Sequence, residues 1–178
     1  MTRLIQDMLY LANADNQSWT IVPSWVELDT LLLNLYEKYE PLAQEKKCRL
    51  TVSLPDQPCS PCKCDENRIE QVLSIFMDNA LSYTPSGGEI HLSLSQTGGL
   101  FQLSVSDNGP GIPDAEKEAI FQRFYRSDQS RHKKGHYGLG LSIAQEIAHL
   151  HHASLRLEDT PGGGATFLLT LARAKNIP

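Results

Sequence analysis

The stretch that decides the fold is Asp107-Asn108-Gly109-Pro110-Gly111-Ile112, in which an acidic residue is followed by two closely spaced glycines. It follows an alternating apolar run over residues 101–105 that is typical of a β-strand. A carboxylate at a strand end can accept a hydrogen bond from an exocyclic amino group, and glycines let the main chain approach a ligand closely. Adenine carries such an amino group, whereas guanine presents a carbonyl there. The stretch therefore favours an adenine-nucleotide site, with a plain Asp-Asn-Gly turn as the alternative.

The composition is that of an ordinary globular domain. The chain has 178 residues, 40% of them hydrophobic and 21% charged, which suits one domain with a real core. A net charge of −5 argues against a nucleic-acid binder, which would show a basic face. The sequence contains neither a run of 18 apolar residues nor an N-terminal secretion signal. We expect a cytoplasmic domain without membrane contact of its own, although a longer parent could be anchored in the cell membrane.

Four cysteines leave two interpretations open. Cys48 stands alone, whereas Cys59, Cys62 and Cys64 form one short cluster. Zinc sites usually pair two separated ligand clusters, and here there is only one. Reduced thiols beside a strand are the prediction, and metal binding or a disulfide is the alternative.

Apolar periodicity predicts helices packed on one face of a mixed sheet. Helical spacing predicts helices over residues 1–12, 24–46, 66–83 and 138–151. Ser24 and Glu27 stand at capping-box spacing, and Asp65 precedes the next helix. Alternating residues predict strands over residues 50–54, 90–94, 101–107, 155–157 and 165–171. The expected fold is an α/β (α+β) two-layer sandwich with a largely antiparallel sheet and a long loop over about 113–137.

The helix predicted over residues 66–83 carries a second clue. Its core stripe is apolar and contains Ile69, Val72, Leu73, Phe76 and Ala80. A neighbouring stripe contains Ile75, Asn79, Ser82 and Tyr83. Asn79 is thus a polar group beside the core, where a solvated or capping asparagine is the ordinary interpretation. Its amide oxygen also suits Mg²⁺, which takes few protein ligands and completes its octahedron with water and phosphates.

The third clue is Gly138-Leu139-Gly140-Leu141, where a long loop becomes a helix. The free N–H groups and positive dipole end of a helix suit a phosphate chain. Glycine at a helix start costs about 1 kcal/mol relative to alanine, so close approach of a ligand or of a neighbouring element must compensate. The sequence contains no P-loop motif and no dinucleotide-binding glycine motif after a strand.

In this order, the motifs resemble those of the histidine kinase catalytic domain, in the family that also includes gyrase, the Hsp90 chaperones and MutL. The resemblance extends over residues 65–171. Residues 65–85 resemble the N box, 107–113 the G1 box, 120–126 the F box, 138–143 the G2 box, and 160–167 the closing glycine turn with the last strand.

The resemblance implies a role for each motif. Asp107 would hold the adenine amino group, Tyr83 would lie beside the base, and Asn79 would hold Mg²⁺. ATP and Mg²⁺ are the implied cofactors, and ADP is the product. The implied nucleotide-binding residues are Asn79, Tyr83, Asp107, Gly109, Gly111, Ile112, Phe124, Arg126, Gly138, Leu139, Gly140, Leu141 and Thr166.

The long segment over about 113–137 would be a nucleotide lid. Phe121 and Phe124 would anchor it to the core, although plain core residues are an alternative for both. Arg126 would face the phosphate tail, which makes Arg126 and Asn79 the catalytic candidates.

Two positions depart from the family pattern. Many of these kinases have an asparagine one turn before the metal-binding asparagine and a lysine three residues after it, where this chain has Ile75 and Ser82. Gyrase and Hsp90 carry a water-activating glutamate at the first of these positions, and Ile75 cannot act as a base. Efficient ATP hydrolysis is therefore disfavoured.

The family's phosphoacceptor is a histidine on a dimerisation hairpin that precedes the catalytic domain. No such motif is present, and we interpret all six histidines as non-acceptors. Residues 1–15 resemble the tail of that hairpin and 16–175 the catalytic domain, so we expect part of a longer sensor kinase. The piece alone is expected to be monomeric, and the parent to be a homodimer that passes phosphate to a response regulator.

Three other functions remain open at this point. A protein-serine kinase of the anti-sigma type would share the fold and lack the histidine hairpin. A hydrolysing ATPase of the gyrase or MutL type is disfavoured by Ile75. A non-catalytic pseudokinase that serves as a docking module is compatible with Ile75 and Ser82.

Overall fold

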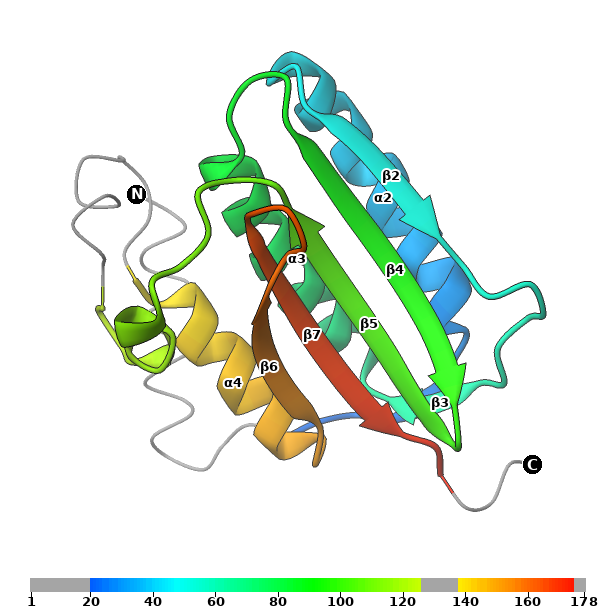
Figure 1. Ribbon diagram of the computed structural model, residues 1–178. Helices are drawn as coiled ribbons and strands as arrows, with labels where there is room; N and C mark the ends of the chain where they lie inside the picture. The colour runs from blue at the N-terminus through cyan, green and yellow to red at the C-terminus, as the bar shows by residue number, and fades with distance from the viewer. Residues whose placement is uncertain (1–19, 126–137, 175–178) are drawn as a thin grey trace.

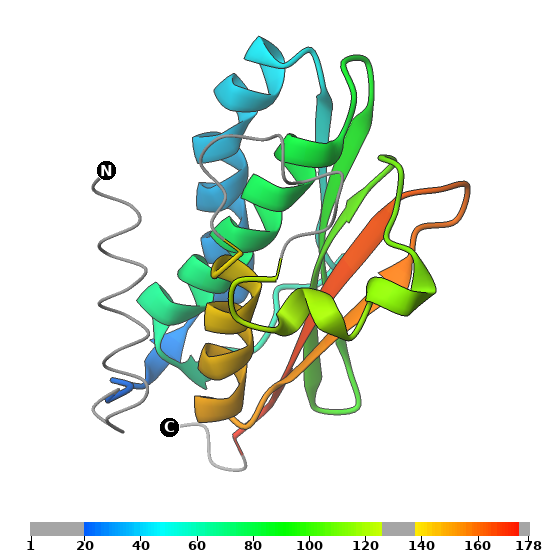
Figure 2. The same ribbon diagram turned by 90° about the vertical axis from the view of Figure 1, so that its left-hand side faces the viewer.

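The computed structural model describes residues 20–125 and 138–174, in which one layer of helices covers one face of a sheet (Figure 1 and Figure 2). The five-stranded sheet has the order β2-β4-β5-β7-β6. Its strands are β2 (Arg49–Ser53), β4 (Glu89–Thr97), β5 (Leu100–Asp107), β7 (Ala165–Ala172) and β6 (Ser154–Asp159). The helices are α2 (Leu28–Glu45), α3 (Glu66–Tyr83) and α4 (Gly140–Leu150). The predicted two-layer sandwich is confirmed.

The register of the sheet follows from its one-sided burial. β2 pairs with β4 in parallel, and the other neighbouring strands pair in antiparallel fashion. Alternate residues of β5 such as Leu103 and Val105 are buried on the helix side. On the opposite face the hydroxyl of Ser104 lies 2.7 Å from that of Ser93 on β4. A slip of one residue would exchange the two faces, so the apolar pattern fixes the pairing.

α3 forms where a cap and an apolar stripe coincide. Asp65 precedes the helix and its carboxylate accepts a hydrogen bond from the backbone N–H of Arg68 at 3.2 Å, as the sequence predicted. The predicted stripe is buried, and the ring of Phe76 stacks on Phe167 of β7 with centroids 5.1 Å apart. This packing fixes the face of α3 that meets the sheet, and hence the direction in which Asn79 points.

The helix predicted over residues 24–46 begins later than expected. Residues Ser24–Val26 form a strand, β1, and α2 begins at Leu28 after Glu27, whose side chain makes no capping hydrogen bond. β1 pairs in antiparallel fashion with β3 (Cys62–Cys64), a short strand that no apolar alternation in the sequence predicts. The capping-box prediction for Ser24 is therefore wrong, because a tertiary pairing outweighs the local signal.

The pairing of β1 with β3 also explains the cysteine cluster. Cys62 and Cys64 alternate with exposed Lys63, so both thiols point into the core. All four cysteines are buried and free. Within the described residues no group of three or more histidine, cysteine, aspartate or glutamate side chains could hold a metal ion.

Some sequence predictions lie outside the described residues. These are the helix end over residues 1–12, the hairpin tail over 1–15 and the part of the lid over 126–137, with Arg126. The first part of the predicted lid is described and contains two short 3-10 helices, η1 (Asp114–Glu116) and η2 (Ala119–Phe121). Among the helices of the described ranges, none has the length and apolar character needed to cross a membrane.

The turn before β7 passes so close to Asp107 that Gly164 has no room for a side chain. A Cβ built on Gly164 would lie 1.8 Å from the backbone oxygen of Asp107, and its φ is +109°. Gly162 in the same turn has a φ of +90° but no atom within 4 Å of such a Cβ. We expect Gly164→Ala to lower the free energy of unfolding by about 3 kcal/mol or more, and Gly162→Ala by only about 1 kcal/mol of backbone strain. Urea unfolding followed by circular dichroism measures both, and equal losses would contradict the steric explanation.

Candidate functional site

Asp107 is a buried carboxylate with one oxygen held by the backbone. Its side chain is 5% exposed at the end of β5. Its Oδ1 accepts hydrogen bonds from the backbone N–H of Gly109 at 2.8 Å and of Ala165 at 3.4 Å. Burial raises the pKa of Asp107, and the two backbone hydrogen bonds oppose that rise. Within the described residues Oδ2 has no hydrogen-bond partner, so it remains an acceptor for a ligand's amino group.

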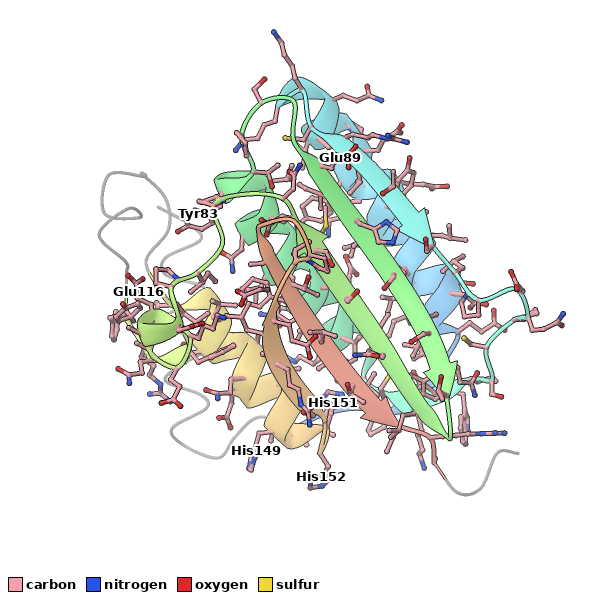
Figure 3. All side chains as sticks on the ribbon, viewed as in Figure 1. Tyr83, Glu89, Glu116, His149, His151 and His152 are labelled. Atoms are coloured by element: carbon pink, nitrogen blue, oxygen red, sulfur yellow. The ribbon has the colours of Figure 1, made fainter. Side chains whose placement is uncertain are left out.

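The loop after β5 is pressed against its neighbours at its glycines. A Cβ on Gly109 would lie 3.1 Å from the carbonyl oxygen of Tyr83, so this loop and the end of α3 are in contact (Figure 3). A Cβ on Gly111, whose φ is +72°, would lie 3.2 Å from the carbonyl oxygen of Gly164. The glycines therefore let the loop, the end of α3 and the turn before β7 meet around Asp107.

α4 begins against α3, close to Asn79. Gly140 is the first residue of α4, and a Cβ on it would lie 3.2 Å from Cγ2 of Ile75 on α3. Asn79 follows Ile75 by one helical turn, so it lies beside the start of α4. The residue before α4, Leu139, makes no side-chain capping hydrogen bond. Within the described residues, the first N–H groups of α4 thus have no side-chain cap, which suits an anion.

Asn79 is suitably placed to hold a metal ion together with phosphates. Its side chain is half-buried and makes no hydrogen bond within the described residues. Because no cluster of other ligands is found there, the protein would contribute the Asn79 oxygen, and water and phosphate oxygens would complete the coordination shell. Such a donor set fits Mg²⁺, which usually keeps several waters and binds few protein groups.

Ser82 is not available for a ligand in the way a lysine would be. Its hydroxyl donates a hydrogen bond to the backbone oxygen of Asp78 at 2.6 Å, one turn back along α3. Asp78 itself accepts a hydrogen bond from the hydroxyl of Tyr39 on α2 at 3.0 Å. This side of α3 is therefore used for packing against α2, and Ile75 on the other side packs against α4.

The family follows from this geometry and from the match of the chain to known proteins. Residues 64–175 match the model of the family described as histidine kinase-, DNA gyrase B- and HSP90-like ATPases. The chain belongs to this family.

Its curated relatives are sensor kinases. The chain is 38% identical over 172 residues to the adaptive-response sensory kinase SasA of Crocosphaera subtropica, and 33% identical over 174 residues to the sensor histidine kinase WalK of Bacillus subtilis. Each match covers 96% of this chain, but only 44% of SasA and 28% of WalK. The chain therefore spans less than half the length of these relatives.

Solved structures agree with the family. Full-length ShkA in complex with AMPPNP superposes with a TM-score of 0.85 at 27% identity, over 97% of this chain and 36% of that chain. The catalytic domain of histidine kinase ThkA superposes with a TM-score of 0.76 at 25% identity, over 86% of this chain and 97% of that domain. The chain is the ATP-binding catalytic domain of a sensor histidine kinase, as the sequence motifs implied.

Among the implied nucleotide-binding residues, Thr166 lies apart from the phosphate-side group, whereas the backbone N–H of Phe124 donates a hydrogen bond to the carbonyl oxygen of Gly138 at 2.9 Å. The hydroxyl of Thr166 lies on the sheet face away from the helices, where it donates to Ser106 at 2.9 Å and lies 2.9 Å from the hydroxyl of Thr160. Phe124 is 60% exposed, so its predicted role as a core anchor is wrong. Phe121 does pack against the core, and so do Ile112 and Leu141. Arg126 lies outside the described residues.

Sequence reasoning missed two structural contributors to the site. Ala165 supplies an N–H to Asp107, which becomes visible only once β5 and β7 are paired. The side-chain oxygen of Asn108 in the motif accepts a hydrogen bond from the N–H of Glu89 at 2.7 Å and so holds the loop to β4. Every residue except proline has a backbone N–H, so the identity of Ala165 could not indicate this contact.

The described start of the segment predicted to be a lid is tied to the sheet by an ion pair. The ammonium group of Lys117, just after η1, lies 2.6 Å from the carboxylate of Asp114 and 2.7 Å from that of Asp159 at the end of β6. The second of these ion pairs joins the segment after η1 to the end of β6. Both carboxylates are largely exposed to solvent, so these ion pairs contribute little to the free energy of folding.

Asp107→Asn should separate binding from stability. Because burial raises the pKa of Asp107 above the ordinary aspartate value of 3.8, ionisation of its carboxyl group opposes folding above that raised pKa. We expect Asp107→Asn to be at least as stable at pH 7, and to bind ATP about tenfold or more weakly, since an NH₂ group cannot accept from adenine. For the wild type, ATP affinity should fall as pH falls through the raised pKa. Calorimetry with exposed Asp56→Asn as the control measures this, and unchanged affinity in Asp107→Asn would refute the adenine assignment.

Proposed function

We propose that the chain binds ATP with Mg²⁺ and transfers the γ-phosphoryl group to a histidine on a two-helix hairpin of the same parent kinase, for relay to a response regulator. The observation that carries the proposal is that, in the part of the chain that the structure describes, the buried Oδ2 of Asp107 has no partner and lies on the same side of the sheet as a helix start without a side-chain cap. The two features would bind opposite ends of one adenine nucleotide, the base and the phosphates.

The residues of this chain would act by positioning and charge. Asp107 would accept a hydrogen bond from the adenine amino group, and the first N–H groups of α4 would donate to phosphate oxygens. Asn79 would hold Mg²⁺, which supplies charge neutralisation at the phosphate chain when it is bound. Arg126 is a further candidate for the phosphate tail. The acceptor imidazole would come from the hairpin and attack in line.

The absence of a base at position 75 favours transfer over hydrolysis. Ile75 is partly buried and fills the space beside Gly140, so no side chain there can take a proton from water. A bound nucleotide would then be kept intact until the hairpin histidine approaches. This argument favours a transferring kinase over an ATPase that hydrolyses its nucleotide directly.

The partners and location of the parent are part of the same proposal. Curated relatives are a sensory kinase and a sensor histidine kinase that are more than twice as long as this chain. We infer that the parent carries the phosphoacceptor hairpin, dimerises through it and keeps this domain on the cytoplasmic side of a membrane-anchored protein. The piece alone would be monomeric, with ATP and ADP as its ligands.

A second candidate is a pseudokinase of the same fold. It is favoured by two observations on α3, namely that Ile75 is apolar and that the hydroxyl of Ser82 is bound to the backbone of Asp78. Neither side chain would therefore supply a polar group to a metal ion or a phosphate. The next two experiments separate this candidate from a working kinase.

ATP binding should be saturable, adenine-selective and dependent on Mg²⁺. We expect Asn79→Ala to remove the effect of Mg²⁺ and to weaken binding about tenfold, whereas Asn79→Asp, which keeps an oxygen ligand, should retain it. GTP should bind at least about tenfold more weakly than ATP, because it offers Asp107 a carbonyl. Isothermal calorimetry with and without Mg²⁺ measures all three. No binding at millimolar ATP would overturn the proposal and leave the pseudokinase.

Phosphoryl transfer should need the hairpin in trans. With γ-labelled ATP, we expect label on an added hairpin of the parent kinase, no label when its histidine is replaced by glutamine, and little free phosphate in the absence of hairpin. The label should be stable in base and labile in acid, as phosphohistidine is and phosphoserine is not. Label on serine would favour the anti-sigma type of kinase, and binding of ATP without any transfer would favour the pseudokinase.

A further inference from the structure

A three-part junction lies at the end of α4 that is far from the nucleotide site (Figure 3). His151 follows the last residue of α4, and its Nε2 accepts a hydrogen bond from the backbone N–H of Asp65 at 3.0 Å. Its Nδ1 donates to the backbone oxygen of Ile147 at 2.8 Å. An amide N–H can only donate and a carbonyl can only accept, so the junction requires a neutral imidazole with its proton on Nδ1.

Asp65 joins a third segment to the same junction. Its carboxylate is 7% exposed and accepts from the N–H of Arg68 at 3.2 Å, which caps α3, and from the N–H of Val22 at 2.9 Å. Within the described residues Asp65 forms no ion pair, so backbone groups alone satisfy it. Val22 belongs to the segment that enters the domain before β1, and Ser24 in β1 pairs with Cys64 next to Asp65.

The junction and the nucleotide site are the two ends of one antiparallel helix pair. α3 and α4 meet at Asp65 and His151 at one end, and at Ile75 and Gly140 at the other. Ten residues of α3 separate the two contacts, which is about 15 Å along its axis. Figure 1 and Figure 2 show the two helices side by side over this length. Because packed helices move as rigid rods, a shift at the junction changes the alignment of α4 against Asn79.

We propose that His151 is a positioning residue of the nucleotide site, and that its contact with Asp65 couples the placement of the segment entering at Val22 to nucleotide affinity. This inference rests on the proposed ATP-binding function and adds a means of regulating it. The entering segment and α4 share Asp65, so displacement of Val22 removes one of the two donors of a buried carboxylate and loosens the residue that holds His151. The phosphate-binding start of α4 then loses its fixed position relative to Asn79.

Two substitutions of His151 test the contact separately from the bulk of the ring. His151→Gln can place an amide oxygen near the Nε2 position and so keep the acceptor for Asp65. His151→Asn is too short to reach Asp65 but can still donate to Ile147. We expect His151→Asn to raise the dissociation constant for ATP about three- to tenfold, within the range for mutations between coupled sites. His151→Gln should stay within about twofold of the wild type, as should His149→Asn, an exposed control at the same helix end.

Hydrogen exchange supplies the readout that a purely local change would not give. In His151→Asn, we expect faster exchange at the amides of Asp65 and Val22 and also in the first turn of α4, about 15 Å away along the helix pair. Circular dichroism checks that the variant is folded. Val22→Pro removes the entering N–H donor at an exposed position and should produce the same change at the start of α4 and a similar loss of ATP affinity. If His151→Asn does not fold, the exchange and affinity of Val22→Pro alone test the coupling.

The outcomes distinguish this inference from the proposed function. Wild-type affinity in both His151→Asn and Val22→Pro would overturn the coupling while leaving ATP binding intact. A wild-type chain that binds no ATP would overturn the proposed function, and the helix-pair coupling would then stand or fall on whether exchange at the start of α4 responds to His151→Asn. Equal losses in the Gln and Asn variants would show that the ring's packing matters, and would overturn the role assigned to Nε2.

Discussion

A carboxylate that is buried away from water needs hydrogen-bond donors. In this domain the segments around Asp107 are placed so that two backbone N–H groups reach it. One donor comes from the loop that follows its own strand and the other from the first residue of β7. The second donor is in reach only because the two strands are paired and because Gly164 has no side chain to separate them. The same contacts that satisfy the acid therefore close the middle of the sheet and bring three chain segments to one place.

Asp65 meets the same requirement with a different outcome. Both of its carboxylate oxygens are used, one by the cap of α3 and one by the entering segment. Asp107 has both donors on a single oxygen, and among the described residues its other oxygen has no partner, which leaves it available to a ligand. Two buried aspartates on similar backbone donors thus differ in what they can do: a fully satisfied acid organises the fold, and a half-satisfied one can recognise a ligand.

Structure could be predicted from the sequence wherever a residue's chemistry agreed with the helical or strand periodicity of the apolar residues around it. The cap at Asp65, the buried stripe of α3 and the strand that ends in Asp107 could all be predicted from spacing alone. The strand at Ser24 could not, because its partner β3 lies 36 residues further along and leaves no local mark. Thr166 could have been placed by counting, since Phe167 faces the helices and its neighbour must face away.

The departures at Ile75 and Ser82 acquire a structural meaning in the context of the helix layer. Ile75 fills the notch left by Gly140, and Ser82 returns its hydroxyl to its own helix. Both positions contribute to holding α3 in place instead of contacting a ligand. The site therefore depends on a small number of polar groups held accurately, which is why the far end of the α3–α4 pair matters to it.

The free, buried thiols have a practical consequence. A thiol reagent can reach a buried cysteine only when the surrounding structure opens, so its rate of labelling reports the opening of that region. Cys59, Cys62 and Cys64 lie in β3 or just before it, where β3 pairs with β1, whereas Cys48 lies where α2 turns into β2. The domain thus contains internal probes at two separate places, one of them beside the strand by which the chain enters. The relative rates at which a thiol reagent modifies these native cysteines would show which of the two regions opens first, and no cysteine would have to be introduced.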